Sequence, residues 1–251
     1  MNTVFTASYR VRSYETDLYC RLKPVTLMNY FQDAASGHAC LLGFSVADLL
    51  QKNHTWVLSR YQIKICRYPC EGEEVTVRTW RSALDGYHAL RDFEAVDEKG
   101  MLVAVAGSSW LILNLDSRRP VHIKAVLDDF PVHDRRSFPD EFIFLPKRGN
   151  YDLSKPFRVR MADLDQNRHV NHTVYPEWAF ETVPPEFFNR CLPAEIHIAY
   201  RAEAVYGGRV ISRSAVIDPA DPGRFLHQLV NEEDGKELTR LITVWRCREN
   251  F

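Results

Sequence analysis

Three polar residues that could do chemistry together stand at alternate positions in the second half of the chain: Asp165, Asn167 and His169. A carboxylate can act as a nucleophile or as a general base for water, and a histidine can exchange protons near neutral pH. An asparagine amide can donate a hydrogen bond that orients a carboxylate or a carbonyl group. On an extended turn, alternation sends all three side chains the same way, which predicts a catalytic cluster. The alternative is a helix-capping turn with a solvated histidine.

A helix is expected directly after this turn, beginning near Asn171. Pro176 lacks an N–H group and is harmless only in a first turn, so the helix cannot begin much earlier. Pro184 and Pro185 end it. Free backbone N–H groups at the start of this helix, together with the positive end of its dipole, would form an oxyanion site beside the polar cluster.

The chain contains an internal repeat, which must position these residues. The stretch YRVRSYETD at 9–17 matches FRVRMADLD at 157–165, an offset of 148 residues. Further along, the offset is 135 residues, and the matched pairs are Gly72 with Gly207, Gly100 with Gly235, and Trp110 with Trp245. The smaller offset predicts 13 extra residues in the first copy, which we place in a longer helical region over 25–52.

Each copy has the pattern of one short strand, a polar turn, a helix and then three or four antiparallel strands. The first helix is expected from about Val25, because Pro24 suits a first turn. Its buried face is predicted from apolar residues at helical spacing, namely Leu27, Phe31, Ala34, His38 and Leu41. The later strands are expected at 63–82, 87–100 and 101–116 in copy one, and at 195–217, 224–235 and 236–247 in copy two.

This order predicts an α+β fold, in which a curved antiparallel sheet wraps a long helix. That is the hotdog arrangement. Two tandem hotdog domains would form a pseudo-dimer whose sheets join edge to edge and so hide exposed strand edges. We expect an N-terminal hotdog domain over 1–115, a proline-rich linker over 116–152, and a C-terminal hotdog domain over 153–251.

The two copies differ where the chemistry is expected. At the offset of 148 residues, Asn167 corresponds to Tyr19 and His169 corresponds to Arg21, while the aspartate is present in both copies. Only the second copy therefore combines a carboxylate, an amide and an imidazole. This asymmetry favours a functional site there over a simple capping turn.

The run DLDQNRHVNHTVYPEWAFETVP at 163–184 closely resembles the signature of the acyl-ACP thioesterase family. The segments RSYETD, WVLSRYQI, EVTVRTW and RDFEAVDEKG of the first copy are similar to that family too, so the resemblance covers nearly the whole chain. His172 departs from the family, which has a second Asn there. The resemblance implies catalytic roles for Asp165, Asn167, His169 and Glu203. Near Glu203, Ala202 and Ala204 replace the family's Arg and Cys, which argues that no thiol is needed.

The activity implied by the resemblance is hydrolysis of fatty acyl-ACP thioesters to free fatty acid and carrier protein, which terminates fatty acid synthesis. No cofactor and no metal ion are expected. Asp165 would either attack the carbonyl to give a mixed anhydride or deprotonate a water, while Asn167 and His169 position the reacting groups. Glu203 would activate or orient the water. The alternative for Glu203 is an ion-paired carboxylate on a strand.

By the same resemblance the acyl chain lies in the N-terminal copy, between helix and sheet, and the candidate lining residues are Leu27, Tyr30, Phe31 and Ala34. The alternative is ordinary packing of a helix on a sheet. The partner would be acyl carrier protein, which is acidic and helical in general, so a basic docking surface is expected. The candidates Arg118-Arg119, Arg135-Arg136 and Lys147-Arg148 are left open, as are a monomer and a homodimer.

Composition narrows the remaining choices. Hydrophobic residues make up 45% and charged residues 26% of 251 residues, which is typical of a globular protein. The net charge of −1 gives no field to hold nucleic acid. No apolar run reaches the length of a bilayer, no targeting segment is recognisable and the six cysteines lack metal-binding spacing, so a cytoplasmic protein with idle thiols is expected. The rival functions are an acyl-CoA thioesterase, a non-catalytic acyl-binding protein and, less favoured, a hotdog dehydratase.

Overall fold

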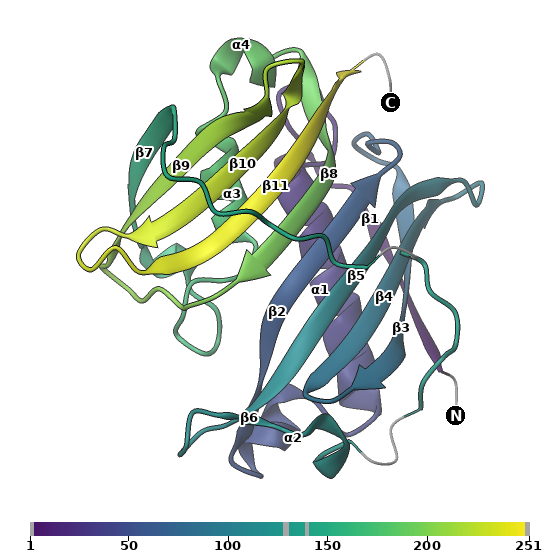
Figure 1. Cartoon of the computed structure of the whole chain (residues 1–251). Coiled ribbons are helices and arrows are strands. Elements are labelled where there is room, and N and C mark those ends of the chain that lie inside the picture. The colour runs from purple at the N-terminus through teal and green to yellow at the C-terminus, as the bar shows by residue number, and fades with distance from the viewer. Residues whose placement is uncertain (1–2, 128–130, 139–140, 249–251) are drawn as a thin grey trace. The chain divides into compact units, whose positions relative to one another are not determined.

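The structure is a computed structural model that describes residues 3–127, 131–138 and 141–248. The chain divides into two compact units, Met1–Glu141 and Phe142–Phe251. We refer to them as the N-terminal unit and the C-terminal unit. In each of them, antiparallel strands curve around a helix (Figure 1).

The N-terminal unit is a sheet with the strand order β1-β3-β4-β5-β2, all neighbours being antiparallel. A short β6 (Pro120–Val121) also pairs with β5. The other elements are β1 (Val4–Arg10), α1 (Pro24–Leu41), α2 (Val46–Leu50), β2 (His54–Ile65), β3 (Glu74–Asp85), β4 (His88–Asp97) and β5 (Leu102–Asn114).

The C-terminal unit repeats this arrangement with the strand order β8-β11-β10-β9-β7, again antiparallel. Its elements are β7 (Leu153–Arg158), α3 (Val174–Phe180), α4 (Pro185–Phe188), β8 (Cys191–Tyr200), β9 (Arg209–Asp218), β10 (Asp221–Asn231) and β11 (Glu237–Cys247). Two tandem hotdog domains, as predicted, are therefore confirmed.

Helix α1 contributes one buried face to the core of the N-terminal unit. Pro24 occupies its first turn, as expected, where the missing N–H group costs nothing. The buried side chains follow helical spacing: Thr26, Leu27, Met28, Tyr30, Phe31, Ala34, Ala35 and His38. Leu41 was predicted on this face, but it is 75% exposed because the helix ends there.

The repeat extends to individual hydrogen bonds. Trp110 Nε1 donates to Ser108 Oγ at 2.8 Å, and Trp245 Nε1 donates to Thr243 Oγ1 at 2.8 Å. Gly72 and Gly207 both have a positive φ, of 88° and 78°, which glycine adopts without steric cost. The offset of 135 residues seen in the sequence therefore describes equivalent positions in space within the two units.

Two predicted strands are each divided. The stretch 63–82 covers the end of β2 and most of β3, and 195–217 covers most of β8 and β9. After β8, the N–H groups of Arg201 and Ala202 both donate to Leu238 O, at 2.8 and 3.1 Å. This shared acceptor interrupts the ladder, and the chain leaves the sheet before β9 begins. Arg67 and its neighbour share Val103 O in the same way after β2.

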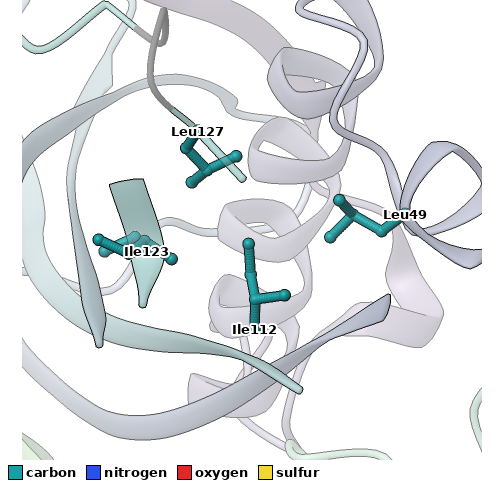
Figure 2. Packing of buried hydrophobic residues seen from close by; sticks show 5 residues of the cluster. Leu49, Ile112, Ile123 and Leu127 are labelled. Carbon is teal, nitrogen blue, oxygen red and sulfur yellow. The ribbon is translucent and has the colours of Figure 1, made fainter. Parts of the chain in front are cut away.

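Much of the stretch expected as a linker, 116–152, packs into one of the two units. Ile123 and Leu127 are fully buried against Leu49 and Ile112 in the N-terminal unit (Figure 2). In the C-terminal unit, Leu145 packs against β10 and β11. Residues 128–130 and 139–140 of this stretch lie outside the described residues. Among the helices of the described ranges, none has the length and apolar character needed to cross a membrane.

Candidate active site

The predicted cluster lies on a tight hairpin turn between β7 and α3. A bridge between Leu164 and Val170 closes the turn. Within it, Asp165 N donates to His169 O at 2.8 Å, and Arg168 N donates to Asp165 O at 3.0 Å. Arg168 has a positive φ of 63°. Side chains alternate strictly only along extended backbone, and the left-handed conformation of Arg168 breaks that extension. The prediction of an extended turn was therefore wrong.

The carboxylate of Asp165 organises this turn. Its Oδ1 accepts the backbone N–H groups of Asn167 at 2.8 Å and of His169 at 3.3 Å. In the part of the chain that the structure describes, no group donates to the other oxygen, Oδ2. One oxygen therefore has the turn-capping role of the alternative interpretation. The second oxygen of this half-buried residue remains available for chemistry.

His169 meets Glu203 across a second short bridge. His169 pairs with Val205, and Val170 N donates to Ala204 O at 2.9 Å. This pairing brings His169 Nε2 to 3.4 Å from Glu203 Oε2, with 27% and 40% of the two side chains exposed. Glu203 lies in the loop between β8 and β9, so the predicted strand location was wrong. A histidine beside a carboxylate can act as an acid–base pair.

The amide of Asn167 lies on the same turn. The Asn167 side chain is half-buried and has no hydrogen-bond partner within the described residues. It can therefore donate to a bound carbonyl oxygen. The structure thus links Asp165 to the backbone of Asn167 and His169, and it places the His169 side chain against Glu203.

Helix α3 begins at Val174, three residues later than predicted. Asn171 explains the delay, because its Oδ1 accepts Thr173 N at 3.1 Å and its backbone O accepts Val174 N at 3.0 Å. These two N–H groups are thereby occupied, which weakens the expected oxyanion site at the helix start. Burial lowers the pKa of the intervening His172 to about 4, so its imidazole is neutral at pH 7.

One residue near the site was not predicted. Tyr175 on α3 is buried, and its hydroxyl oxygen accepts the N–H group of Ala204 at 3.0 Å. Burial raises the pKa of the Tyr175 hydroxyl, and the negative charges of Glu203 and Asp165 raise it further. The hydrogen bond from the Ala204 N–H group acts in the opposite direction. A sequence signal existed, since at the offset of 148 residues the first copy has Leu27 in this position.

The N-terminal unit contains the same turn with different side chains. Asp17 Oδ1 accepts the N–H groups of Tyr19 at 2.8 Å and of Arg21 at 3.0 Å. Leu22 N donates to Pro69 O at 2.8 Å, as Val170 N donates to Ala204 O in the second copy. Tyr68, which precedes Pro69, therefore occupies the position of Glu203.

The four residues proposed to contact the acyl chain all lie on the inner face of α1: Leu27, Tyr30, Phe31 and Ala34. Phe31 packs against Phe93 with the ring centroids 5.1 Å apart. Tyr30 stacks on Tyr9 at 4.4 Å and donates to Glu15 at 2.7 Å. In this structure they form helix-on-sheet packing, as the alternative interpretation has it.

Several of the basic residues considered for docking have partners within their own unit. Arg135 pairs with Glu94, Arg136 lies 3.0 Å from Asp92, and Arg148 donates to Val216 O at 2.7 Å. Among the described residues, no group of three or more His, Cys, Asp or Glu side chains could hold a metal ion.

Fold and site together define a double hotdog protein with a histidine–carboxylate pair in its second domain. Residues 2–130 match the family model for the acyl-ACP thioesterase N-terminal domain, and residues 147–247 match that for the acyl-ACP thioesterase C-terminal domain. The chain belongs to the acyl-ACP thioesterase family.

Individual relatives agree with this assignment. The chain is 29% identical, over 97% of its length, to a palmitoyl-acyl carrier protein thioesterase of Cuphea hookeriana, and spans 62% of that protein. It is 29% identical, over 94% of its length, to oleoyl-acyl carrier protein thioesterase 1 of Arabidopsis thaliana, of which it spans 74%. Against the first of these it thus covers about three fifths of the relative's length.

Solved structures show the same fold. The 12:0-ACP thioesterase of Umbellularia californica is 26% identical, with a TM-score of 0.88 over 98% of both chains. An acyl-ACP thioesterase of Bacteroides thetaiotaomicron has a TM-score of 0.87 over 98% of both chains, and at 24% identity it supports the fold alone.

Proposed function

We propose that this protein hydrolyses fatty acyl-ACP thioesters to free fatty acid and carrier protein. The observation that carries the proposal is the contact of His169, on the turn organised by Asp165, with Glu203 of the β8–β9 loop. It occurs in a chain whose two halves match acyl-ACP thioesterase domains. A nucleophile or base, an acid–base partner and a hydrogen-bond donor are the groups that thioester hydrolysis requires.

The roles follow from the contacts of each side chain. Oδ1 of Asp165 is held by two backbone N–H groups, which fixes the orientation of Oδ2. Oδ2 either attacks the thioester carbonyl or removes a proton from water. Asn167 donates to the carbonyl oxygen, where negative charge develops in the transition state. The His169–Glu203 pair supplies the proton that the leaving thiolate takes up. In the nucleophilic route it also accepts the proton released by the water that hydrolyses the anhydride.

The two routes available to Asp165 predict different intermediates. Direct attack breaks the carbon–sulfur bond and leaves an acyl group on Asp165 as a mixed anhydride, which water then hydrolyses. General-base catalysis has no acyl-enzyme. Rapidly quenched reactions of the Glu203→Gln variant, analysed by mass spectrometry, would reveal an acyl adduct on the peptide containing Asp165 only if this residue is the nucleophile.

We propose that the two units have different roles in the reaction. The C-terminal unit carries the reacting groups, and the N-terminal unit receives the acyl chain along the inner face of α1, at Leu27, Tyr30, Phe31 and Ala34. Because these side chains are buried in mutual packing, acyl binding requires them to separate from the sheet.

An acyl-CoA thioesterase on the same fold is the second candidate, and a non-catalytic acyl-binding protein is the third. Purified protein given mixed acyl-ACPs should release free fatty acids, and the matched acyl-CoAs should react more slowly. Faster hydrolysis of acyl-CoA would overturn the choice of carrier. Binding of both substrates without product would overturn the proposal of an enzyme.

A further inference from the structure

Tyr175 makes a hydrogen bond that ties helix α3 to the loop carrying Glu203. Its side chain is 3% exposed, and its hydroxyl oxygen accepts Ala204 N at 3.0 Å. Its ring lies 5.9 Å from that of Trp178 and 6.0 Å from that of Tyr200, both nearly perpendicular. Packing therefore fixes the position of the hydroxyl group.

The peptide of Ala204 is held on both sides. Its N–H group donates to Tyr175, and its carbonyl oxygen accepts Val170 N at 2.9 Å. Glu203 precedes Ala204 in the chain, and His169 precedes Val170. The two bonds therefore set the backbone from which Glu203 extends toward His169, where the side chains come within 3.4 Å.

The N-terminal unit lacks both partners of this bond. Leu27 stands at the position of Tyr175 and offers no acceptor. Pro69 stands at the position of Ala204 and has no N–H group to donate. Yet Pro69 O still accepts Leu22 N at 2.8 Å, so the fold keeps one bond without the other. The tyrosine–amide bond is thus not needed to build a hotdog unit, and it occurs in the unit that contains the histidine–carboxylate pair.

We propose that Tyr175 is a positioning residue for thioester hydrolysis, which acts through Ala204 to hold Glu203 against His169. The proposal rests on the proposed function. Burial and the nearby carboxylates keep the Tyr175 hydroxyl neutral, because its pKa is raised above the ordinary value. Tyr175 therefore contributes geometry rather than charge.

The test is the variant Tyr175→Phe, which removes the hydroxyl and keeps the ring. We expect kcat on acyl-ACP to fall about 10-fold, the effect of one hydrogen bond, with KM unchanged. The matched control is Tyr200→Phe, which removes a hydroxyl from the same aromatic cluster, where it donates to His172 O at 3.0 Å. This control should keep the wild-type kcat at a similar loss of thermal stability.

A double-mutant cycle separates positioning from general stability. If Tyr175 acts through Glu203, Tyr175→Phe should lower kcat little further in a Glu203→Gln background. Equal losses in both backgrounds would overturn the proposal, as would a wild-type kcat in Tyr175→Phe. Should that variant fold poorly, Ala204→Pro removes the donor instead and should give the same kcat loss. A wild-type protein inactive on acyl-ACP would instead refute the proposed function.

A second, independent observation concerns two cysteines of the C-terminal unit. Cys191 on β8 lies directly opposite Cys247 on β11 in the antiparallel register of the two strands. Directly opposed residues on antiparallel strands have Cα atoms about 4.5–5.5 Å apart, a separation that suits a disulfide. Cys191 is buried and Cys247 is exposed.

The geometry points to Cys191–Cys247 as a site of reversible disulfide formation. The exposed thiolate of Cys247 attacks a low-molecular-weight disulfide, which releases one thiolate and leaves a mixed disulfide. Cys191 then attacks the Cys247 sulfur, releases the second thiol and closes the bond. The protein loses two hydrogens, and the small disulfide is reduced to two thiols.

Incubation with glutathione disulfide tests this site. Peptide mapping should find a Cys191–Cys247 link, and oxidation should raise the Tm by roughly 5–15 °C, because the bond closes a long loop. The variant Cys247→Ser should show no Tm change on oxidation. Glutathione retained on Cys247 without closure, or a link confined to other cysteines, would overturn the inference.

Discussion

The turns at Asp17–Arg21 and Asp165–His169 have one backbone design and two sets of side chains. In each turn the aspartate accepts two N–H groups, and the fourth residue is left-handed, with φ of 59° at Cys20 and 63° at Arg168. The aspartate therefore belongs to the scaffold of both units. What distinguishes the second turn is the set of side chains around the aspartate.

Four positions differ together between the two units, two of them on the turn itself and two on the elements that contact it. The pairs, with the residue of the N-terminal unit first, are Tyr19 and Asn167, Arg21 and His169, Leu27 and Tyr175, and Tyr68 and Glu203. An amide, an imidazole, a buried hydroxyl and a carboxylate thus converge on a turn that the other unit keeps without them. Variants at matched positions of the two units therefore separate loss of chemistry from loss of folding.

The largest expected effect is at the histidine–carboxylate pair. His169→Ala and Glu203→Gln should each lower kcat on acyl-ACP by about 10²–10⁴-fold, the usual contribution of acid–base catalysis. The matched variants Arg21→Ala and Tyr68→Phe should leave kcat within about twofold. Steady-state kinetics with all four proteins checks this. Similar losses in both units would show that the turns matter only for folding.

The two units should also differ in acid sensitivity at one core position. His227 on β10 is fully buried between Thr182 and Thr243, and burial lowers its pKa to about 3. The strand pairing of β4 puts Phe93 at the equivalent place, since Phe93 faces Ala106 as His227 faces Leu241.

The difference in proton binding between the folded and the unfolded chain determines how stability changes with pH. Between pH 6.5 and pH 3 the unfolded chain protonates this histidine and the folded chain does not, so its contribution to stability is complete above pH 6.5 and is lost as pH falls toward 3. Between pH 7.5 and 4.5, His227→Gln should lose roughly 3 kcal/mol less unfolding free energy than the wild type, at about 1.4 kcal/mol per pH unit. Urea unfolding at both pH values measures this. Equal losses would contradict it.

A smaller effect should distinguish the inner faces of the two helices. Ala34 on α1 and Ala179 on α3 are both fully buried. Substitution by Leu should cost roughly 1–3 kcal/mol of stability at either position, through overpacking. Only Ala34→Leu should shift the released fatty acids toward shorter chains. Gas chromatography of the released fatty acids measures the chain-length distribution for both variants. An identical shift in Ala179→Leu would contradict the assignment of the acyl chain to the inner face of α1.

The smallest expected effect concerns the aspartate of the first turn. Asp17→Ala removes the acceptor for two N–H groups and should cost roughly 1–2 kcal/mol of unfolding free energy. Because the N-terminal turn carries no reacting group, kcat should stay at the wild-type value. Thermal unfolding and a kinetic assay of the same preparation check both expectations.

The sequence was sufficient to predict the repeat, the hotdog class and the helix after Pro24, because these depend on periodicity and on residues with strict backbone preferences. It misplaced Glu203 on a strand, since the interruption after Tyr200 depends on two N–H groups sharing Leu238 O. That contact joins distant parts of the chain and has no local signal. The hairpin form of the Asp165 turn was missed because a left-handed arginine at 168 is uncommon.

Substitution of each aspartate by asparagine tests most directly whether one turn is chemical and the other structural. Asparagine keeps an oxygen that can accept the two N–H groups, and it removes the carboxylate. We expect Asp165→Asn to lose at least about 100-fold in kcat on acyl-ACP, and Asp17→Asn to retain the wild-type value, with both variants folded. Equal activity in the two variants would contradict the account.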